Sequence, residues 1–240
     1  VKSYRDLPLR LAEAGTVYRN ELSGVTYGLI RVKSMTQNDA HIYVAPEQLK
    51  DEFMSVLKMF DEVYKTVGIK NYWFRLSLPD FKGKPEKYIG NPKIWTHASE
   101  EIRKAMKEFG RKHSEETGEA SFYGPKIDVQ IKNAQEKEET IATAQVDVVV
   151  QKRIGLTYID DKGNKQCPIV IHRAILGSYE RFIAYLLEQT SGALPVWLSP
   201  IQIRMLNFTD RNTKTAEKIL EQLRKEIPGL RIDSDFRSTI

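Results

Sequence analysis

Apolar residues recur at steps of three and four positions in two long segments of the chain. In the first segment, which follows Ala45-Pro46, the apolar positions are Leu49, Phe53, Val56, Leu57, Phe60, Val63, Tyr64 and Val67. This spacing puts them on one face of a helix, with proline in its first turn and Gly68 at its end. The second segment, residues 94–112, repeats the pattern with Ile102, Ala105, Met106 and Phe109. Each segment predicts an amphipathic helix that buries one face.

Shorter segments of mixed apolar and polar residues, separated by turn-forming residues, predict strands. These segments are residues 16–22, 28–35, 41–44, 72–78, 127–131, 141–150, 156–159 and 168–171. Ser23-Gly24 falls in the loop after the first segment, the charged stretch 132–140 joins a later pair, and residues 161–164 turn the last pair. Residues 79–92 are predicted to form a loop, and residues 173–188 a buried helix. Because the strands come in pairs, the pattern predicts an α+β fold with a mainly antiparallel sheet flanked by helices.

The pattern changes after Ala193-Leu194-Pro195. Residues 201–208 predict a strand, 213–226 a helix and 230–236 a second strand, which is the start of an alternating α/β domain. Three elements in about forty residues bury too little apolar surface to be stable alone. We therefore expect two parts, residues 1–195 and an incomplete domain at residues 200–240.

Composition narrows the class of protein only in part. Of the 240 residues 41% are hydrophobic, which excludes wholesale disorder, and the net charge of +5 fits a polyanion partner or ordinary surface lysine equally well. The single cysteine, Cys167, excludes an internal disulfide and indicates a reducing compartment, the cytoplasm. No stretch is long and apolar enough to span a membrane, and the start at Val1 carries no signal peptide. Because Met is missing there, we expect a fragment of a longer protein.

Charged residues on two neighbouring predicted strands suggest a site for phosphate. Arg19 and Glu21 alternate along one strand and would point the same way, and Arg31 lies on the next strand. A guanidinium group can bond two phosphate oxygens at once, and a nearby carboxylate can accept from an adenine amino group or help to hold a metal. Taken alone, these residues also fit a surface Arg–Glu ladder.

The surrounding motifs resemble those of a known enzyme family. Tyr18-Arg19-Asn20-Glu21 followed by Arg31 resembles motif 2 of the class II aminoacyl-tRNA synthetases, and residues 177–182 resemble their motif 3. Residues 3–10, 36–41, 122–126 and 171–178 are similar to the threonyl-tRNA synthetases in particular, in register from Ser3 to about Phe208. The resemblance implies a class II catalytic domain at residues 1–195, without its N-terminal part, and a truncated anticodon-binding domain at 200–240. The implied activity is that of a threonine–tRNA ligase.

The resemblance also implies roles for single residues. Arg19 and Arg181 would be catalytic, with Arg19 on the α-phosphate and on the threonine carboxylate. The residues expected to bind ATP, together with Mg²⁺, are Arg19, Glu21, Arg31, Met35, Lys126 and Arg181. Those expected to bind threonine are Gln37, Asp39, Tyr123, Gln145 and Ser178. Met35 departs from the family, which usually has an aromatic residue there to stack on adenine; a thioether packs less rigidly.

Two histidines fall on family positions that hold zinc. His41 and His172 would bind Zn²⁺ together with a cysteine that lies upstream of this chain. An apolar pocket discriminates poorly between threonine and the isosteric valine. A zinc ion with open coordination positions can bind the threonine hydroxyl, which valine lacks. Cys167 is not the family's cysteine and is expected to be a small core residue, and His97 and His113 are expected to be structural.

Two other functions remain open at this stage. A non-catalytic synthetase-like paralogue could act as an RNA- or protein-binding module, which Met35 and the missing cysteine favour but the retained arginines oppose. A class II ligase for another amino acid, such as proline or serine, is opposed by the pair His41 and His172. The partners implied by the resemblance are ATP, L-threonine and tRNA(Thr), with a homodimer in the full-length enzyme.

Overall fold

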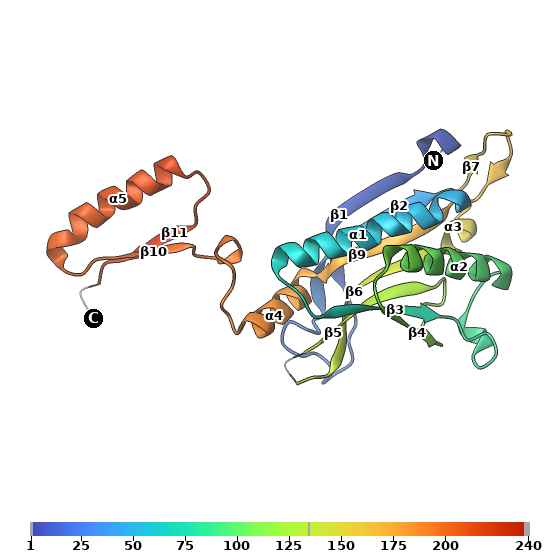
Figure 1. Ribbon diagram of the computed structural model, residues 1–240, viewed down its shortest axis with the longest axis horizontal. Helices are drawn as coiled ribbons and strands as arrows, with labels where there is room; N and C mark the ends of the chain where they lie inside the picture. Colours follow the sequence, from blue (N-terminus) through green and yellow to red (C-terminus); the bar gives the residue numbers. More distant parts are fainter. Residues whose placement is uncertain (1, 134, 238–240) are drawn as a thin grey trace. The chain divides into compact units, whose positions relative to one another are not determined.

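The computed structural model describes residues 2–133 and 135–237 of the chain (Figure 1). The chain divides into two compact units, Val1–Gln189 and Thr190–Ile240. Each unit has its own sheet, and each is considered separately below. Within the described part of the chain, no helix has the length and apolar character needed to cross a bilayer.

The first unit is built on a seven-stranded sheet with the order β1-β2-β9-β6-β5-β3-β4. Its strands are β1 (Leu9–Tyr18), β2 (Ser34–Val44), β3 (Tyr72–Leu78), β4 (His113–Thr117), β5 (Lys126–Lys132), β6 (Glu138–Asp147) and β9 (Ile169–Ser178). All neighbouring strands are antiparallel except β3 and β4, which are parallel. A small hairpin pairs β7 (Tyr158–Ile159) with β8 (Lys165–Gln166). The α+β fold with a mainly antiparallel sheet is confirmed.

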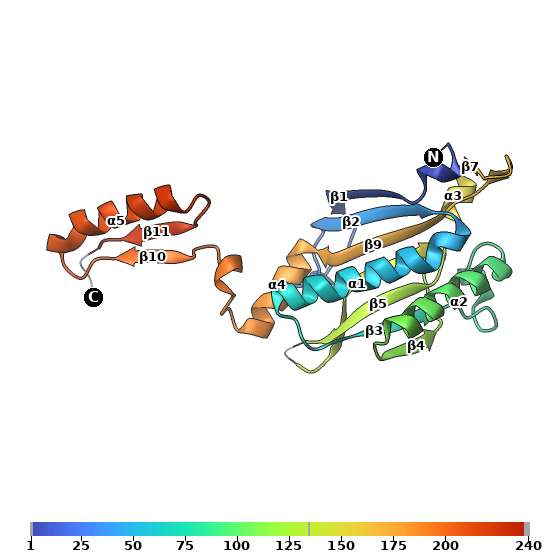
Figure 2. The same cartoon turned by 45° about the horizontal axis from the view of Figure 1, so that its top comes forward.

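Two long helices, α1 (Leu49–Val67) and α2 (Pro92–Phe109), pack side by side against one face of this sheet (Figures 1 and 2). Both helices were predicted from their apolar spacing. The apolar side chains on that face of each helix form the core together with the inner face of the sheet. Gly68 ends α1 with φ 83°, a conformation that glycine adopts at little cost. A third helix, α4 (Tyr179–Thr190), follows β9, and the other helical elements are short: η1 (Tyr4–Asp6), η2 (Pro46–Gln48), η3 (Pro85–Lys87) and α3 (Val150–Arg153).

The prediction of strands at residues 16–22 and 28–35 is wrong at their facing ends. β1 begins earlier and stops at Tyr18, and β2 begins only at Ser34. Between them the chain leaves the ladder and turns, with positive φ at Gly24 and Gly28. Arg19, Glu21 and Arg31 therefore lie in a long loop and not on strands, because these glycines favour turns over extended pairing.

The prediction of a helix over residues 173–188 is wrong in its first part. Residues 173–178 belong to β9, which is paired on both sides by β2 and β6, and α4 begins only at Tyr179. A continuous apolar run in a central strand cannot be told from a buried helix by periodicity alone. Residues 169–171 of the predicted hairpin strand 168–171 belong to β9, whereas the hairpin itself pairs Tyr158–Ile159 with Lys165–Gln166. The edge strand β4 was not predicted, since its sequence is almost entirely polar.

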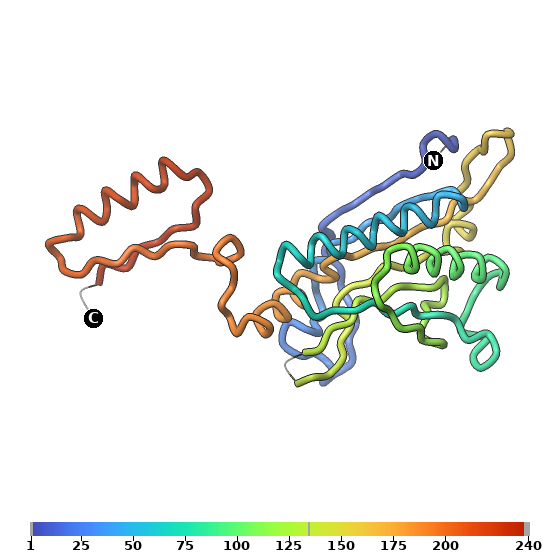
Figure 3. Tube along the Cα trace, in the orientation of Figure 1, coloured from blue at the N-terminus to red at the C-terminus, as the bar shows by residue number. Residues whose placement is uncertain are grey.

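The second unit contains a parallel pair of strands, β10 (Ile203–Leu206) and β11 (Ile232–Asp235), connected by α5 (Thr213–Glu226) (Figure 3). Two short 3-10 helices, η4 (Val196–Leu198) and η5 (Asp210–Asn212), complete it. The order strand–helix–strand and the bounds of the helix are as predicted, while both strands are shorter. The crossover between parallel strands is the unit from which α/β domains are built.

Candidate active site

The predicted site residues converge on the face of the sheet opposite α1 and α2. One row across neighbouring strands reads His41, His172, Gln145 and Lys126 in register. The next row reads Asp39, Ala174 and Thr143. Because side chains alternate along strands, residues two positions apart share this face, while their neighbours fill the core. Four neighbouring strands, β2, β9, β6 and β5, thus supply one surface.

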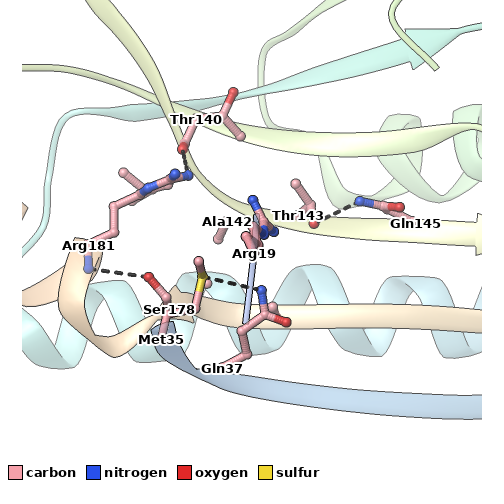
Figure 4. A pocket seen from close by; sticks show the side chains of 12 residues that line it. Arg19, Met35, Gln37, Thr140, Ala142, Thr143, Gln145, Ser178 and Arg181 are labelled. Carbon is pink, nitrogen blue, oxygen red and sulfur yellow. Dashed lines mark hydrogen bonds between the residues drawn. The ribbon is translucent and has the colours of Figure 1, made fainter. Parts of the chain in front are cut away.

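Two adjoining cavities, of about 170 Å³ and about 260 Å³, lie on this surface. The first is lined by Arg19, Met35, Gln37, Thr140, Ile141, Ala142, Thr143, Gln145, Ala174, Gly177, Ser178 and Arg181 (Figure 4). The second is lined by Arg19, Gln37, Asp39, Tyr123, Thr143, Gln145, His172, Arg173 and Ala174. Since five residues line both, we treat the cavities as two ends of one site, the arginine end and the histidine end.

At the arginine end, neither Arg19 nor Arg181 is paired with a carboxylate of the residues that the structure describes. Arg181, in the first turn of α4, donates from Nε to the Ile30 carbonyl at 3.0 Å. Its Nη1 donates to the Thr140 carbonyl at 3.3 Å (Figure 4). Burial lowers the pKa of Arg181 below its ordinary value, and the positive charge of Arg19 lowers it further. The carboxylate of Glu139 raises this pKa, whereas Arg31 lowers it and Glu21 raises it to a smaller extent, so burial and Arg19 set the direction of the shift. Because Arg181 is half-buried and lies near the positive charge of Arg19, a bound anion would be stabilised at this end.

A carboxylate and a second arginine are paired in the loop beside this end. Arg31 donates from Nη2 and Nε to Glu21 Oε2, at 3.0 and 3.2 Å. The Glu21 side chain is only 11% exposed, so the pair is partly shielded from solvent. Buried Met35 lies against the cavity, and Gln37 donates to its sulfur at 3.9 Å. Where the family usually has an aromatic ring to stack on adenine, this chain has the buried thioether of Met35.

Hydrogen-bonding side chains line the histidine end. Gln145 Oε1 accepts from Ser121 (3.1 Å) and from the Tyr123 hydroxyl, and Gln145 Nε2 donates to Thr143 (3.2 Å). Burial raises the pKa of the Tyr123 hydroxyl, which keeps it a neutral donor. Asp39 accepts from its neighbouring backbone amide at 2.9 Å and keeps further acceptor capacity. These fixed donors and acceptors suit a small polar ligand.

The two predicted zinc ligands are in contact. The rings of His41 and His172 have centroids 4.5 Å apart and meet edge to face. His172 Nε2 lies 3.2 Å from Asp147 Oδ2, and the other Asp147 oxygen accepts from the amides of Val149 and Val150. A carboxylate that bonds one imidazole nitrogen leaves the other for a metal.

This donor set is incomplete by itself. Over residues 2–133 and 135–237, no group of three His, Cys, Asp or Glu side chains could hold a metal ion. Cys167 is not near enough to complete one, and burial raises the pKa of its thiol, which disfavours the thiolate that zinc requires. The chain therefore offers two nitrogen donors, which fit a site completed by a ligand from elsewhere.

Comparison with known proteins identifies the fold. Residues 1–190 match the model of the tRNA synthetase class II core domain (G, H, P, S and T). The chain belongs to this class II synthetase family. Threonine–tRNA ligase 1 of Bacillus subtilis (strain 168) is 44% identical over 99% of this chain, and the threonine–tRNA ligase of Listeria welshimeri is 45% identical over 99%. The chain spans 36% and 37% of the length of these two relatives, so the homology concerns about a third of each.

Solved structures give the same relationship. The RNA-binding domain of threonyl-tRNA synthetase from Cryptosporidium parvum Iowa II superposes with a TM-score of 0.87 at 34% identity, covering 99% of this chain and 57% of that one. Putative threonyl-tRNA synthetase ThrRS-1 from Aeropyrum pernix has a TM-score of 0.82 at 29% identity, covering 98% and 54%. A prolyl-tRNA synthetase from Cryptosporidium parvum, at 16% identity and TM-score 0.69 with 100% and 43% covered, shows the fold alone.

Within this synthetase core, most predicted site residues line one of the two cavities, and four do not. Lys126 turns its ammonium group toward Asp128 and is absent from both linings among the residues that the structure describes. Glu21 and Arg31 lie in the neighbouring loop, bonded to each other. His41 borders the cavity only through its contact with His172.

Two residues that shape the site were not predicted from the sequence. Asp147 holds His172, and Thr140 offers its carbonyl to Arg181. Asp147 had a usable signal, because it is the one charged residue between Ile141 and Val150 and it shares a strand face with Gln145. Thr140 had none, because its role is carried by the backbone.

Gly177 lets β9 turn into α4 beside the arginine end. Its φ is 64°, and an added Cβ would lie 2.2 Å from the Ile141 carbonyl oxygen. We expect Gly177→Ala to lower the free energy of unfolding by about 2–5 kcal/mol, since it combines a left-handed alanine with an overpacked contact. Gly68→Ala is the matched control: it has φ 83° but open space, and should cost only about 1–2 kcal/mol. Equal losses in chemical denaturation of the two variants would contradict the close-contact argument.

Proposed function

We propose that this chain is the catalytic part of an enzyme that activates L-threonine with ATP and transfers it to tRNA(Thr). The observation that carries the proposal is the arginine end, where Arg19 and half-buried Arg181 place positive charge beside a small polar pocket, with the Arg31–Glu21 pair in the neighbouring loop. Polyphosphate beside an amino acid is the ligand pair that such a site fits best. Homology to threonine–tRNA ligases supports threonine as that amino acid.

In the first step, the threonine carboxylate attacks the α-phosphorus of ATP and pyrophosphate leaves. The attacking carboxylate is already ionised at neutral pH, so no general base is needed. Arg19 would hold both the α-phosphate and the carboxylate, and Arg181 would bind the outer phosphates, with Arg31 beside it. Catalysis then comes from positioning and from neutralising charge that develops in the transition state. Magnesium bound with ATP would supply additional charge neutralisation.

In the amino-acid pocket, Gln37, Asp39, Tyr123, Gln145 and Ser178 would bind threonine. Near this pocket we propose that His41 and His172 supply two ligands of a zinc ion, with a cysteine from outside this chain as the third. Zinc bound there would offer a coordination position to the threonine hydroxyl, which valine lacks. Asp147 would orient His172 through its hydrogen bond.

In the adenine region, Glu21 would accept from the amino group and Met35 would pack on the ring. Glu21 is now held by Arg31, so nucleotide binding would require this pair to share or exchange partners. Lys126 would act near the phosphates. Residues 200–240 would begin an anticodon-binding domain, and the full enzyme would be a cytoplasmic homodimer.

The test is ATP–pyrophosphate exchange by the purified full-length enzyme with a panel of threonine, serine, valine and proline. Threonine should give the highest rate, serine a lower one, and valine and proline almost none. Highest exchange with proline would assign the site to another class II ligase. A complete lack of exchange with every amino acid would instead leave a non-catalytic RNA- or protein-binding module.

A further inference from the structure

A buried carboxylate with two cations lies one strand away from the cavities. Asp128, on β5, is completely buried. Its oxygens accept from Lys126 Nζ at 2.7 and 2.8 Å, from Ser77 Oγ at 2.7 Å and from Arg75 Nη2 at 3.1 Å. The Lys126 and Arg75 side chains are 18% and 23% exposed, so the whole cluster is shielded.

The register of the sheet connects this cluster to the cavities. Lys126 is paired with Gln145 and Asp128 with Thr143, and both partners line both cavities. Side chains directly opposite on neighbouring strands have Cβ atoms about 4.5–5.5 Å apart. A lysine stem is long and flexible enough to turn its ammonium group from Asp128 toward the cavity across this short distance.

The charges of the cluster do not balance. Asp128 contributes one negative charge, while Lys126 and Arg75 contribute two positive charges. If Lys126 left, Asp128 would keep its bonds to Arg75 and Ser77, so no buried carboxylate would be abandoned without a counterion. If Arg75 were removed, Lys126 would be the last cation and would be held more tightly.

We propose that Asp128 is a positioning residue that holds the Lys126 ammonium group one strand away from the cavities, and that Arg75 allows its release to an ATP phosphate oxygen. This inference rests on the proposed function for the identity of the phosphate ligand. The Lys126 ammonium group would then leave the Asp128 carboxylate for a phosphate oxygen, and Asp128 would keep its hydrogen bonds to Arg75 and Ser77. The rival reading is a cluster that only stabilises the fold.

The first test measures how accessible Lys126 is, without reference to activity. The purified protein is acetylated with a water-soluble succinimidyl ester, and modification of each lysine is followed by mass spectrometry. We expect Asp128→Asn to speed acetylation of Lys126 about tenfold, because a charge-assisted contact is lost. Arg75→Gln should slow it, and Arg75→Lys should restore the wild-type rate. Lys132, on the same strand and 53% exposed, is the matched control and should not change.

General loosening of the fold would raise the acetylation rate of Lys126 in both variants, so it cannot explain a faster rate in Asp128→Asn together with a slower rate in Arg75→Gln. If Asp128→Asn does not fold, the Arg75 pair alone still decides the question. An unchanged or faster rate at Lys126 in Arg75→Gln would overturn the proposal, as would an unchanged rate in Asp128→Asn.

The second test uses threonine-dependent ATP–pyrophosphate exchange. Lys126→Ala should lower kcat/KM for ATP about tenfold, and adding Asp128→Asn to it should change the value by less than about twofold, because the two residues act as a unit. Losses that multiply would assign Asp128 to stability alone and overturn the proposal, as would full activity in Lys126→Ala. If the unsubstituted protein shows no exchange, the proposed function fails, while acetylation still decides whether Asp128 positions Lys126.

Discussion

Arg19→Ala is expected to lower threonine-dependent ATP–pyrophosphate exchange by about a hundred- to thousandfold, the usual effect of removing a group that stabilises developing charge. Arg19 lines both cavities, so it is the one cation positioned to contact both reacting groups among the cavity residues that the structure describes. Its positive charge also reaches Arg181, whose pKa it lowers. Removing it would leave the carboxylate and the α-phosphate to repel each other at the moment of attack.

The loss should appear in kcat more than in KM for ATP, because Arg31 and Arg181 would still bind the outer phosphates. Arg103→Ala is a suitable control: Arg103 lies on α2, away from the cavities, and pairs with Glu115. It should keep exchange within about twofold of the unsubstituted rate, as surface pairs contribute little. Exchange near that rate in Arg19→Ala would remove Arg19 from the proposed role.

Local sequence patterns predicted the elements whose own residues show a clear apolar spacing and a clear end. α1 is amphipathic and ends at Gly68, and α5 and β3 have the predicted bounds. The helix wrongly predicted over residues 173–178 failed because periodicity does not report which strand lies beside which. The run ending at Ser178 is extended because β2 and β6 flank it on both sides, a fact of tertiary pairing.

The site shows the same division between residue identity and geometry. Motifs were enough to select Gln37, Gln145, Ser178 and Arg181, which the fold gathers around one cavity. They did not predict that Lys126 turns toward Asp128 or that Asp147 holds His172. Hydrogen bonds between strands depend on register, which the sequence specifies only through the whole hydrophobic pattern.

The pairing of His41 with His172 leads to the second large expected effect. In the full-length enzyme, which would supply the cysteine, His172→Ala should reduce bound zinc from about one ion per chain to less than about a tenth, because sites with three protein ligands rarely survive the loss of one. His41→Ala should do the same, since the two rings are 4.5 Å apart and would share one ion. Zinc content is measured by inductively coupled plasma mass spectrometry after dialysis, independently of activity.

Two further variants distinguish direct binding of zinc by the histidines from orientation of His172 by Asp147. Asp147→Asn should weaken zinc binding about 10- to 100-fold while leaving both imidazoles present, because it removes the acceptor that orients His172. His97→Ala changes a histidine on α2, which lines a different pocket, and should retain the full metal content. Loss of zinc should also remove the preference for threonine over valine in exchange, because only the threonine hydroxyl can bind the metal. Zinc retained in both His41→Ala and His172→Ala would refute the proposed metal site and, with it, the physical basis for selecting threonine at this pocket.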